Sequence, residues 1–446
     1  MKITIILILL FIISGYAFGQ TSKNIEFNKE YTNVNIDKSQ DLNYVLKLDK
    51  GSLYSISVFQ QGIDIKLVLT DESGKQILEH DSPNGQNGFE RFECTPAETK
   101  KFNLKIVRLE QKGNPESGQV TIQIKKFTKR ELQLRERIKK ELETENQKTV
   151  ITADIDHFWE AFDNLKNCKS SIDSINSFQS LYLDRATDGL IDFIAARQFS
   201  AEKFVDAVRG FPKFYNSVRE NTYKVKNAVP LIEEIVAKFQ QIYPNFKPSK
   251  ICFAIGLINT GGTVSDKFLL IGTEVTTATK YNDLSEFNGS VYSKYLASGD
   301  SVVQKIKNMV AHEYVHTQQT KPYDENSIGC MLLYKSMKEG FCDFIGEIIS
   351  GSQINSITHL YGDQHEKQLW QEFKNELCNS SDDNWLYNYS TVKDKPADLG
   401  YYIGYKIAEE YYKNATDKKQ AIADIIEMND PIKFLQISKY DQKEKQ

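Results

Sequence analysis

The sequence predicts a multidomain protein in which an N-terminal all-β sandwich is followed by a mainly helical α+β domain. Over residues 21–127, apolar and polar positions alternate in short stretches that are separated by turn residues, which is typical of a small β-sandwich. From residue 154 onward, apolar residues recur at helical spacing, with two strand-like apolar runs within 251–275. A chain of 446 residues is long enough for two or three domains.

Residues 1–19 have the layout of a secretory signal peptide. Lys2 precedes an apolar run from Ile3 to Ile13, and the small-residue segment Ala17-Phe18-Gly19 follows. No cysteine follows the apolar run, so the lipoprotein signal is missing. We therefore expect a mature chain that begins near Gln20, is exported to the periplasm or the extracellular space, and has no stable membrane span after cleavage.

Five strands of the sandwich are predicted from apolar alternation, at 42–48, 54–58, 65–69, 102–106 and 120–124. Within residues 21–127, the stretches Asp64–Gly74 and Phe102–Ile106 resemble the pre-peptidase C-terminal domain of secreted bacterial peptidases. The resemblance implies an accessory domain beside a catalytic one. The alternative is an unrelated adhesion or carbohydrate-binding sandwich.

Residues 128–149 are dense in both acids and bases, which predicts a charged helical linker and not a nucleic-acid patch. The second domain is expected over 150–437. In it, Phe158, Trp159, Phe162 and Leu165 line one face of a helix, and Pro230 is expected to open another helix over 231–239. The apolar runs 251–255 and 268–275, with Asn259–Gly262 between them, predict a hairpin or a looped pair of strands.

The segment from His312 to His316 is a His-Glu-x-x-His motif within a helical pattern that follows Asp300-Ser301. Two histidines four positions apart share one helix face, so both rings can bind one metal ion. Glu313 projects beside that ion, where it can take a proton from a water molecule. Six histidines in 446 residues would give this pattern by chance in about one such chain in a hundred. The motif therefore favours a metal site over a coincidence on an amphipathic helix.

A third ligand is expected downstream, because catalytic zinc takes three protein ligands and keeps one position open. Glu339 and Asp343 are four positions apart in a second helical run that ends at Ser350-Gly351. With the first motif, this Glu-x-x-x-Asp resembles the gluzincin metallopeptidases. The resemblance implies that His312, His316 and Glu339 bind zinc, and that Asp343 accepts the free N–H of one histidine. The 22 positions from 317 to 338 are a few more than in the best-known members.

Alternatives remain open for Glu339. Ser336 stands three positions before it, as in a capping box at the start of a helix, and Glu347 is the reserve candidate for the third ligand. Gln319 and Pro322 stand where a metzincin motif would place Gly and a third His, which excludes that pattern.

A late helical run, residues 399–412, contains Gly400 and Gly404, which allow close packing against another helix. Gluzincins often supply a Tyr or His from a late helix to hydrogen-bond the oxyanion. The resemblance therefore makes Tyr401 the candidate, with Tyr402 and Tyr405 as alternates. The other interpretation is that these tyrosines only pack a C-terminal helix.

In gluzincins a mixed sheet precedes the motif helix, and its edge strand pairs with extended substrate. Edge pairing presents a peptide backbone regularly to the metal, so the strand runs at 251–255 and 268–275 are candidates for this role. The alternative is a buried sheet with no substrate role. Over about 150–435 the chain is also similar to bacterial families of predicted zinc-dependent proteases, which conveys no substrate.

Six cysteines in an exported chain permit disulfides, and their spacing leaves all fifteen pairings open. Cys330 and Cys342 flank Glu339 and can be proposed as soft metal ligands. They form no C-x-x-C pair, so buried thiols or a bridge are expected instead.

Together these features predict an exported zinc-dependent peptidase, a hydrolase that uses Zn²⁺ as cofactor and acts on peptide or protein substrates, with Glu313 as general base. The alternative is a cell-envelope binding or assembly protein that retains a non-catalytic zinc site. Glu313 argues against it, because a structural site has no use for a base. A net charge of −4 does not indicate a nucleic-acid partner.

Overall fold

The computed structural model describes residues 23–82, 84–299, 301–319, 329–379 and 381–445. The predicted signal peptide and Pro322 lie outside these residues. The chain divides into two compact units, Met1–Arg137 and Ile138–Gln446. No helix in the described ranges is both long and apolar enough to cross a membrane.

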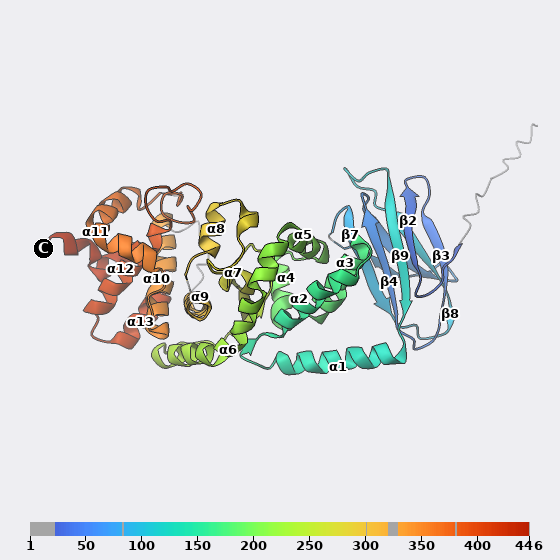
Figure 1. Ribbon diagram of the computed structural model, residues 1–446, viewed down its shortest axis with the longest axis horizontal. Coiled ribbons are helices and arrows are strands. Elements are labelled where there is room, and N and C mark those ends of the chain that lie inside the picture. The colour runs from blue at the N-terminus through green and yellow to red at the C-terminus, as the bar shows by residue number, and fades with distance from the viewer. Residues whose placement is uncertain (1–22, 83, 300, 320–328, 380, 446) are drawn as a thin grey trace, which may run out of the picture. The chain divides into compact units, whose positions relative to one another are not determined.

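The first unit is a β-sandwich, as predicted (Figure 1). One sheet has the order β1-β3-β8-β5-β6 and the other β2-β9-β4-β7. Alternate residues of both sheets point inward, and Leu46, Ile56, Leu67, Leu104 and Ile122 are buried in one apolar core. The strands are β1 (Lys23–Asn24), β2 (Glu30–Asp37), β3 (Leu42–Leu48), β4 (Tyr54–Gln61), β5 (Ile65–Asp71), β6 (Gln76–His80), β7 (Asn87–Cys94), β8 (Lys100–Arg108) and β9 (Ser117–Lys126).

All five strands expected from alternation are present, within β3, β4, β5, β8 and β9. The strands β2, β6 and β7 were not predicted, because polar residues interrupt their alternation; β2 reads Glu-Tyr-Thr-Asn-Val-Asn-Ile-Asp. The charged segment after the sandwich forms α1 (Lys129–Glu145), which has no buried residue.

A small sheet with the order β10-β11-β13-β12 lies within the second unit. Its strands are β10 (Val150–Ile151), β11 (Lys250–Ala254), β12 (Gly262–Val264) and β13 (Phe268–Gly272). The two predicted strands are parallel neighbours, so they form a looped pair and not a hairpin. Strand β12 pairs antiparallel with β13 and is one of the two edge strands of the sheet, the other being β10. Residues 251–254 and 268–272 are all buried, as expected of strands covered on both faces.

Helices before β11 are α2 (Ala153–Asn164), α3 (Ser171–Leu181), α4 (Asp188–Arg197), α5 (Ala201–Gly210) and α6 (Pro212–Ile242). The prediction that Pro230 opens a helix is wrong, because Pro230 lies inside the 31-residue helix α6. An interior proline costs about 3 kcal/mol. Buried residues on both sides of it, among them Val225 and Ile232, outweigh that cost.

Helices after β13 are α7 (Thr273–Thr276), α8 (Val291–Leu296), α9 (Val302–His316), α10 (Met331–Ser350), α11 (Ser356–Glu376), α12 (Leu399–Asn414), α13 (Lys418–Ile426) and α14 (Pro431–Ser438). In Figure 1, α10 and α12 lie side by side. Glycines allow this close approach: an added Cβ would lie 2.2 Å from Tyr405 N at Gly340 and 1.9 Å from the Ser336 carbonyl at Gly404.

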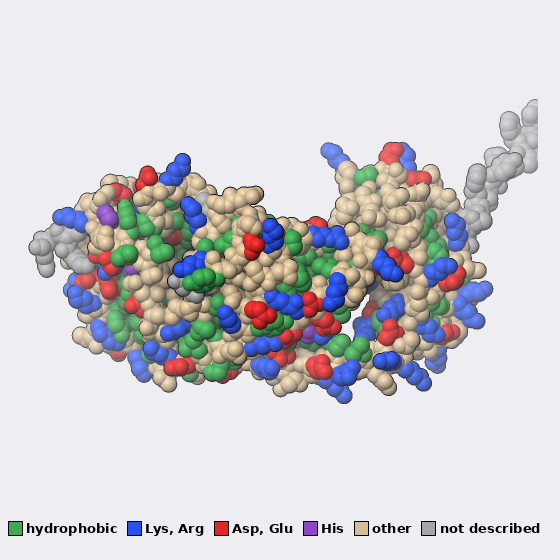
Figure 2. Space-filling model, in the orientation of Figure 1, with side chains coloured by type: hydrophobic (Ala, Val, Ile, Leu, Met, Phe, Trp, Pro, Cys, Tyr) green, Lys and Arg blue, Asp and Glu red, His purple; other side chains and the backbone are tan. Residues whose placement is uncertain are grey.

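Side chains of both charge signs are interspersed on the visible face of the molecule (Figure 2). Three residues separate β12 from β13, and helix α9 contacts β12, β13 and α7. The contact between β12 and α9 lies beside the candidate site.

Candidate metal site

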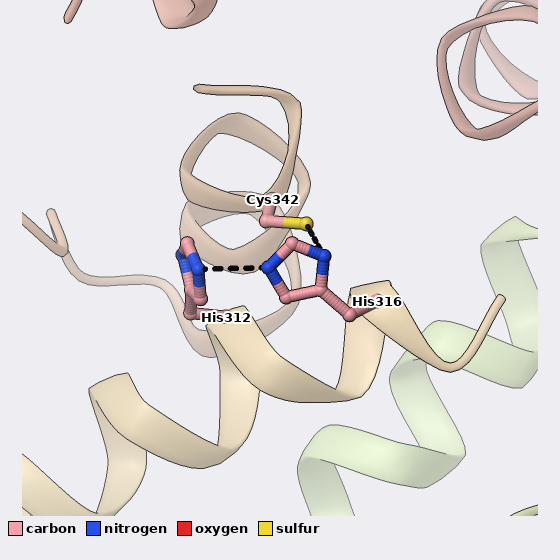
Figure 3. A group of neighbouring side chains, drawn as sticks. All are labelled: His312, His316 and Cys342. Carbon is pink, nitrogen blue, oxygen red and sulfur yellow. Dashed lines mark hydrogen bonds between the residues drawn. The ribbon is translucent and has the colours of Figure 1, made fainter. Parts of the chain in front are cut away.

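Helix α9 brings the two histidines of the motif together. Ser301 caps the helix, because its hydroxyl accepts the backbone N–H of Gln304 at 3.3 Å. Val310 and Val315 are buried and hold the helix in the domain. At the other end, His312 and His316 lie on one face, and their Nε2 atoms are 3.2 Å apart (Figure 3).

Helix α10 brings Glu339 to the same point. Its Oε2 lies 3.2 Å from His316 Nε2 and 3.4 Å from His312 Nε2. The capping-box alternative is wrong, because α10 begins at Met331, five residues before Ser336, and the buried Ser336 hydroxyl has no hydrogen-bond partner. Glu347, the reserve candidate, accepts a hydrogen bond from Tyr405 at 2.9 Å and does not join this group.

The other ring nitrogen of each histidine is occupied. His312 Nδ1 lies 2.7 Å from Asp343 Oδ1, and the other carboxylate oxygen of Asp343 accepts from Asn355 at 2.6 Å. Asp343 is 1% exposed, so this pairing is shielded from water. Of the two histidines, Asp343 therefore contacts His312.

Gln319 supports His316 in the same way. Its Oε1 lies 2.9 Å from His316 Nδ1, and its Nε2 donates to the Lys338 carbonyl at 2.8 Å. The carbonyl contact fixes which end of the amide is nitrogen, so the oxygen faces the histidine. His316 Nδ1 then carries the proton, and Nε2 is left with a free lone pair.

Cys342 also lies beside His316. His312, His316 and Cys342 form a buried group whose ligand atoms lie within 4.8 Å of one another and which could hold a metal ion. The sulfur is 3.3 Å from His316 Nδ1, on the side of the ring that faces away from His312 (Figure 3). Burial raises the pKa of the Cys342 thiol well above its usual range.

Without a metal ion, the histidines and the carboxylates of this group shift one another's pKa values. Burial lowers the pKa of His312, but hydrogen bonds to Asp343 and Glu339 outweigh it and raise that pKa well above its usual value. Burial likewise raises the pKa of Glu339, yet the neighbouring His316 and His312 lower it well below its usual value. The proton that His312 holds between these groups is one that a bound cation would displace.

Glu313 lies against the edge strand. A Cβ added at Gly262 would lie 2.7 Å from the Glu313 Cδ, so glycine leaves the room that this carboxylate occupies. The Tyr295 hydroxyl is near the preceding residue, 3.1 Å from the Cβ position of Gly261. Burial and the charge of Glu313 raise the pKa of Tyr295 to about 12, so its phenol is protonated at neutral pH.

Of the three candidate tyrosines, only Tyr401 reaches this group. Its ring stacks on His312 with centroids 5.9 Å apart. Burial and the charge of Glu339 raise the pKa of Tyr401 well above its usual range, so its phenol can donate a hydrogen bond. The Tyr402 hydroxyl instead donates to Asp363, and that of Tyr405 to Glu347.

Three residues that support the site were not predicted from the sequence: Gln319, Asn355 and Tyr387. The Tyr387 hydroxyl donates to Glu339 Oε1 at 2.9 Å. Gln319 follows His316 by three positions and could have been found by helical spacing. Tyr387 is one of 23 tyrosines and Asn355 stands before α11, so neither is marked by a pattern.

Residues 268–430 match the family described as "Predicted Zn-dependent protease (DUF2268)". This range contains His312, His316, Glu339 and Asp343. No curated protein matches the chain.

Among solved structures, similarity is found to the pre-peptidase C-terminal domain of collagenase from Bacillus anthracis, with 20% identity, 24% of this chain and 95% of that chain covered, and a TM-score of 0.20. PliG of Aeromonas hydrophila, a periplasmic inhibitor of g-type lysozyme, is 8% identical, with 24% and 96% covered and a TM-score of 0.20. The corresponding inhibitor of Salmonella Typhimurium is 21% identical, with 23% and 96% covered and a TM-score of 0.17.

Proposed function

We propose that this chain is a zinc-dependent peptidase whose zinc ligands are His312 Nε2, His316 Nε2 and Glu339 Oε2. The main support is the triangle that these atoms form, with sides of 3.2, 3.2 and 3.4 Å. Around tetrahedral zinc, with bonds of about 2.0–2.2 Å, neighbouring ligand atoms are about 3.3 Å apart. Three atoms at this spacing fit three corners of the tetrahedron and leave the fourth for water or substrate.

Cys342 is not part of the proposed ligand set. Its sulfur lies at His316 Nδ1, whereas His316 faces His312 and Glu339 through Nε2. The two nitrogens of one imidazole face away from each other, so one ion cannot contact both. We assign Cys342 to the packing behind His316.

Glu313 is the proposed general base. When bound, zinc polarises the scissile carbonyl and lowers the pKa of a water molecule. Glu313 accepts a proton from the water molecule as the water oxygen bonds to the carbonyl carbon. Glu313 then passes that proton to the amide nitrogen as the C–N bond breaks. The Tyr401 phenol is placed to donate a hydrogen bond to the carbonyl oxygen as negative charge develops there.

The edge strand β12 is the proposed place for the substrate backbone. It is the edge strand next to β13, its three residues are all partly exposed, and Gly262 lies directly against Glu313. A peptide added beside β12 as an extended strand would bring its backbone past the base at a regular spacing. This supports a peptide or protein substrate.

Export is part of the proposal. A disulfide joins Cys330 to Cys378, and such bonds persist mainly outside reducing compartments. The signal-peptide pattern of residues 1–19 agrees with it. In this proposal, residues 21–127 are an accessory domain and 150–437 the catalytic one.

Replacing Glu313 by glutamine tests the mechanism. Gln cannot accept the proton, so hydrolysis of a peptide library should fall by about 10²–10⁴-fold, while zinc stays bound at the wild-type stoichiometry, measured by elemental analysis. Glu347→Gln is the matched control, because Glu347 bonds Tyr405 outside the site. Full activity in the Glu313→Gln variant would contradict the assignment of Glu313 as the general base. Wild-type protein that binds no zinc would contradict the proposed site itself.

A further inference from the structure

The two carboxylate oxygens of Glu339 have different partners. Oε2 faces the two histidine nitrogens, whereas Oε1 accepts a hydrogen bond from the Tyr387 hydroxyl at 2.9 Å. Glu339 is 9% exposed, so little water competes for either oxygen. Oε2 is therefore the oxygen that faces the proposed metal position, and Oε1 is the oxygen that the phenol holds.

Tyr387 reaches Glu339 from an irregular segment before α12 that is held in place by hydrogen bonds. The Tyr387 N–H donates to Asp398 Oδ1 at 2.6 Å, and the Asp398 N–H donates to Asn388 Oδ1 at 3.0 Å. Asp398 is 7% exposed, so these bonds are largely shielded from solvent.

Tyr387 and Asp398, the two residues joined by the first of these hydrogen bonds, both have a left-handed backbone. Tyr387 has φ of 54° and Asp398 has φ of 61°. A left-handed conformation costs a non-glycine residue about 1–2 kcal/mol and persists only where surrounding contacts impose it. Tyr387 is also 60% exposed as a residue, so burying its ring in a core is not what holds it there. The contact that its hydroxyl makes is with Glu339.

We propose that Tyr387 is a positioning residue that keeps Glu339 bound to the metal through Oε2 alone. This rests on the proposed zinc site. A carboxylate that binds through both oxygens occupies two coordination positions, and the position needed for water is then crowded or lost. By holding Oε1, the Tyr387 hydroxyl preserves the open position. Tyr387 acts through Glu339 and is not assigned any contact with substrate.

The test replaces the zinc of the full chain by Co²⁺, whose visible absorption is stronger when it has four ligands than when it has five. In Tyr387→Phe the phenol is removed and Oε1 is freed, so the absorption should weaken toward the five-coordinate form. With zinc, kcat should fall about tenfold or more while KM changes little, because the open position and not substrate binding is affected.

Tyr405→Phe is the matched control. It removes a phenol–carboxylate bond of the same 2.9 Å length, between the same helix α10 and the Tyr405 hydroxyl, at Glu347 outside the site. This variant should keep the wild-type cobalt spectrum. A second variant, Asp398→Ala, leaves the phenol but removes its backbone anchor, and should give a partial form of the Tyr387→Phe change.

A cobalt spectrum in Tyr387→Phe that equals those of wild type and Tyr405→Phe, with circular dichroism showing all three folded, would overturn the proposal. Because the spectrum is measured without substrate, this result is distinct from failure of the peptidase assignment. A wild-type chain that binds no Co²⁺ would overturn both.

Discussion

Each proposed zinc ligand has one atom facing the common point and a second atom bonded to a partner. His312 uses Nδ1 for Asp343, His316 uses Nδ1 for Gln319, and Glu339 uses Oε1 for Tyr387. The partner fixes the tautomer of each histidine and the orientation of each side chain. The remaining atoms therefore converge before any metal arrives.

Asp343 joins His312 to Asn355 through its two carboxylate oxygens. Asp343→Ala should weaken zinc retention against a chelator by about 10–100-fold, although Asp343 is not a ligand. Asp343→Asn should also weaken zinc retention. If the amide oxygen of the new side chain accepts from His312, its N–H₂ group faces the N–H₂ group of Asn355, and two donors then meet. The double variant Asp343→Asn/Asn355→Asp restores a donor and an acceptor across that contact.

Chelator titration of the three variants checks this prediction. The double variant should retain zinc better than Asp343→Asn alone, which a general loss of stability would not produce. If Asp343→Ala retains zinc as wild type does, Asp343 has no part in holding the site.

The residues that could be predicted from the sequence are those whose neighbours are set by helical spacing. His312 with His316, and Glu339 with Asp343, are each four apart, so their shared faces follow from the helix. Tyr387 and Asn355 could not be predicted, because their places depend on the path of irregular segments between helices. Glu339 as a cap was a wrong alternative, because the apolar residues from Met331 to Tyr334 extend α10 at its start.

At the scale of elements, the site depends on how closely α10 approaches α12. Gly340 and Gly404 face each other across this contact, and neither has room for a methyl group. Gly400 and Gly404 were predicted to allow close helix packing, and the structure has it. Since α10 presents Glu339 and α12 presents Tyr401, spreading these helices would separate two parts of the site.

Gly404→Ala should therefore lower the free energy of unfolding by about 3 kcal/mol or more, because its Cβ would lie 1.9 Å from a backbone carbonyl that cannot move aside alone. Denaturant titration measures the loss. Gly210→Ala is the control, since Gly210 ends a helix and no atom lies within 4 Å of its added Cβ. Equal stabilities for the two variants would contradict the packing described.

Other elements departed from prediction where tertiary contacts outweighed local signals. The strand predicted over 268–275 ends at Gly272, and Thr273 begins the short helix α7. Glu274 in that helix is fully buried, and it accepts the N–H groups of Gly256 and Ile258. An apolar run alone does not reveal that its last residues form a helical turn whose glutamate accepts hydrogen bonds from the loop after β11.

At the scale of the whole molecule, zinc should stabilise the protein more at higher pH. In the metal-free chain the pKa of His312 is raised, so its contribution to stability is complete below about pH 6.5 and is lost as pH rises through the folded-state pKa. The pKa of Glu339 is lowered, so its contribution is present above about pH 4.5 and is lost on acidification. Zinc must displace the proton of His312, and its affinity therefore rises with pH.

The difference in unfolding midpoint between zinc-loaded and chelated protein should thus grow from pH 6 to pH 8. Calorimetry of both forms across this range measures it. The Glu313→Gln variant should follow the same trend, because Glu313 is not a proposed ligand. A difference that stays constant or shrinks over this range would contradict proton displacement at the site.

The Cys330–Cys378 disulfide has a practical consequence for every one of these measurements. It ties the residue before α10 to a position 48 residues later, and closing a loop of that size is worth about 4 kcal/mol by the chain-entropy model. Protein made in a reducing cytosol would lack this disulfide, so the start of α10, the helix that carries Glu339, would be less firmly held in wild type and variants alike. Recombinant material should come from an oxidising compartment, and a count of free thiols in each batch should precede any comparison of metal content between variants.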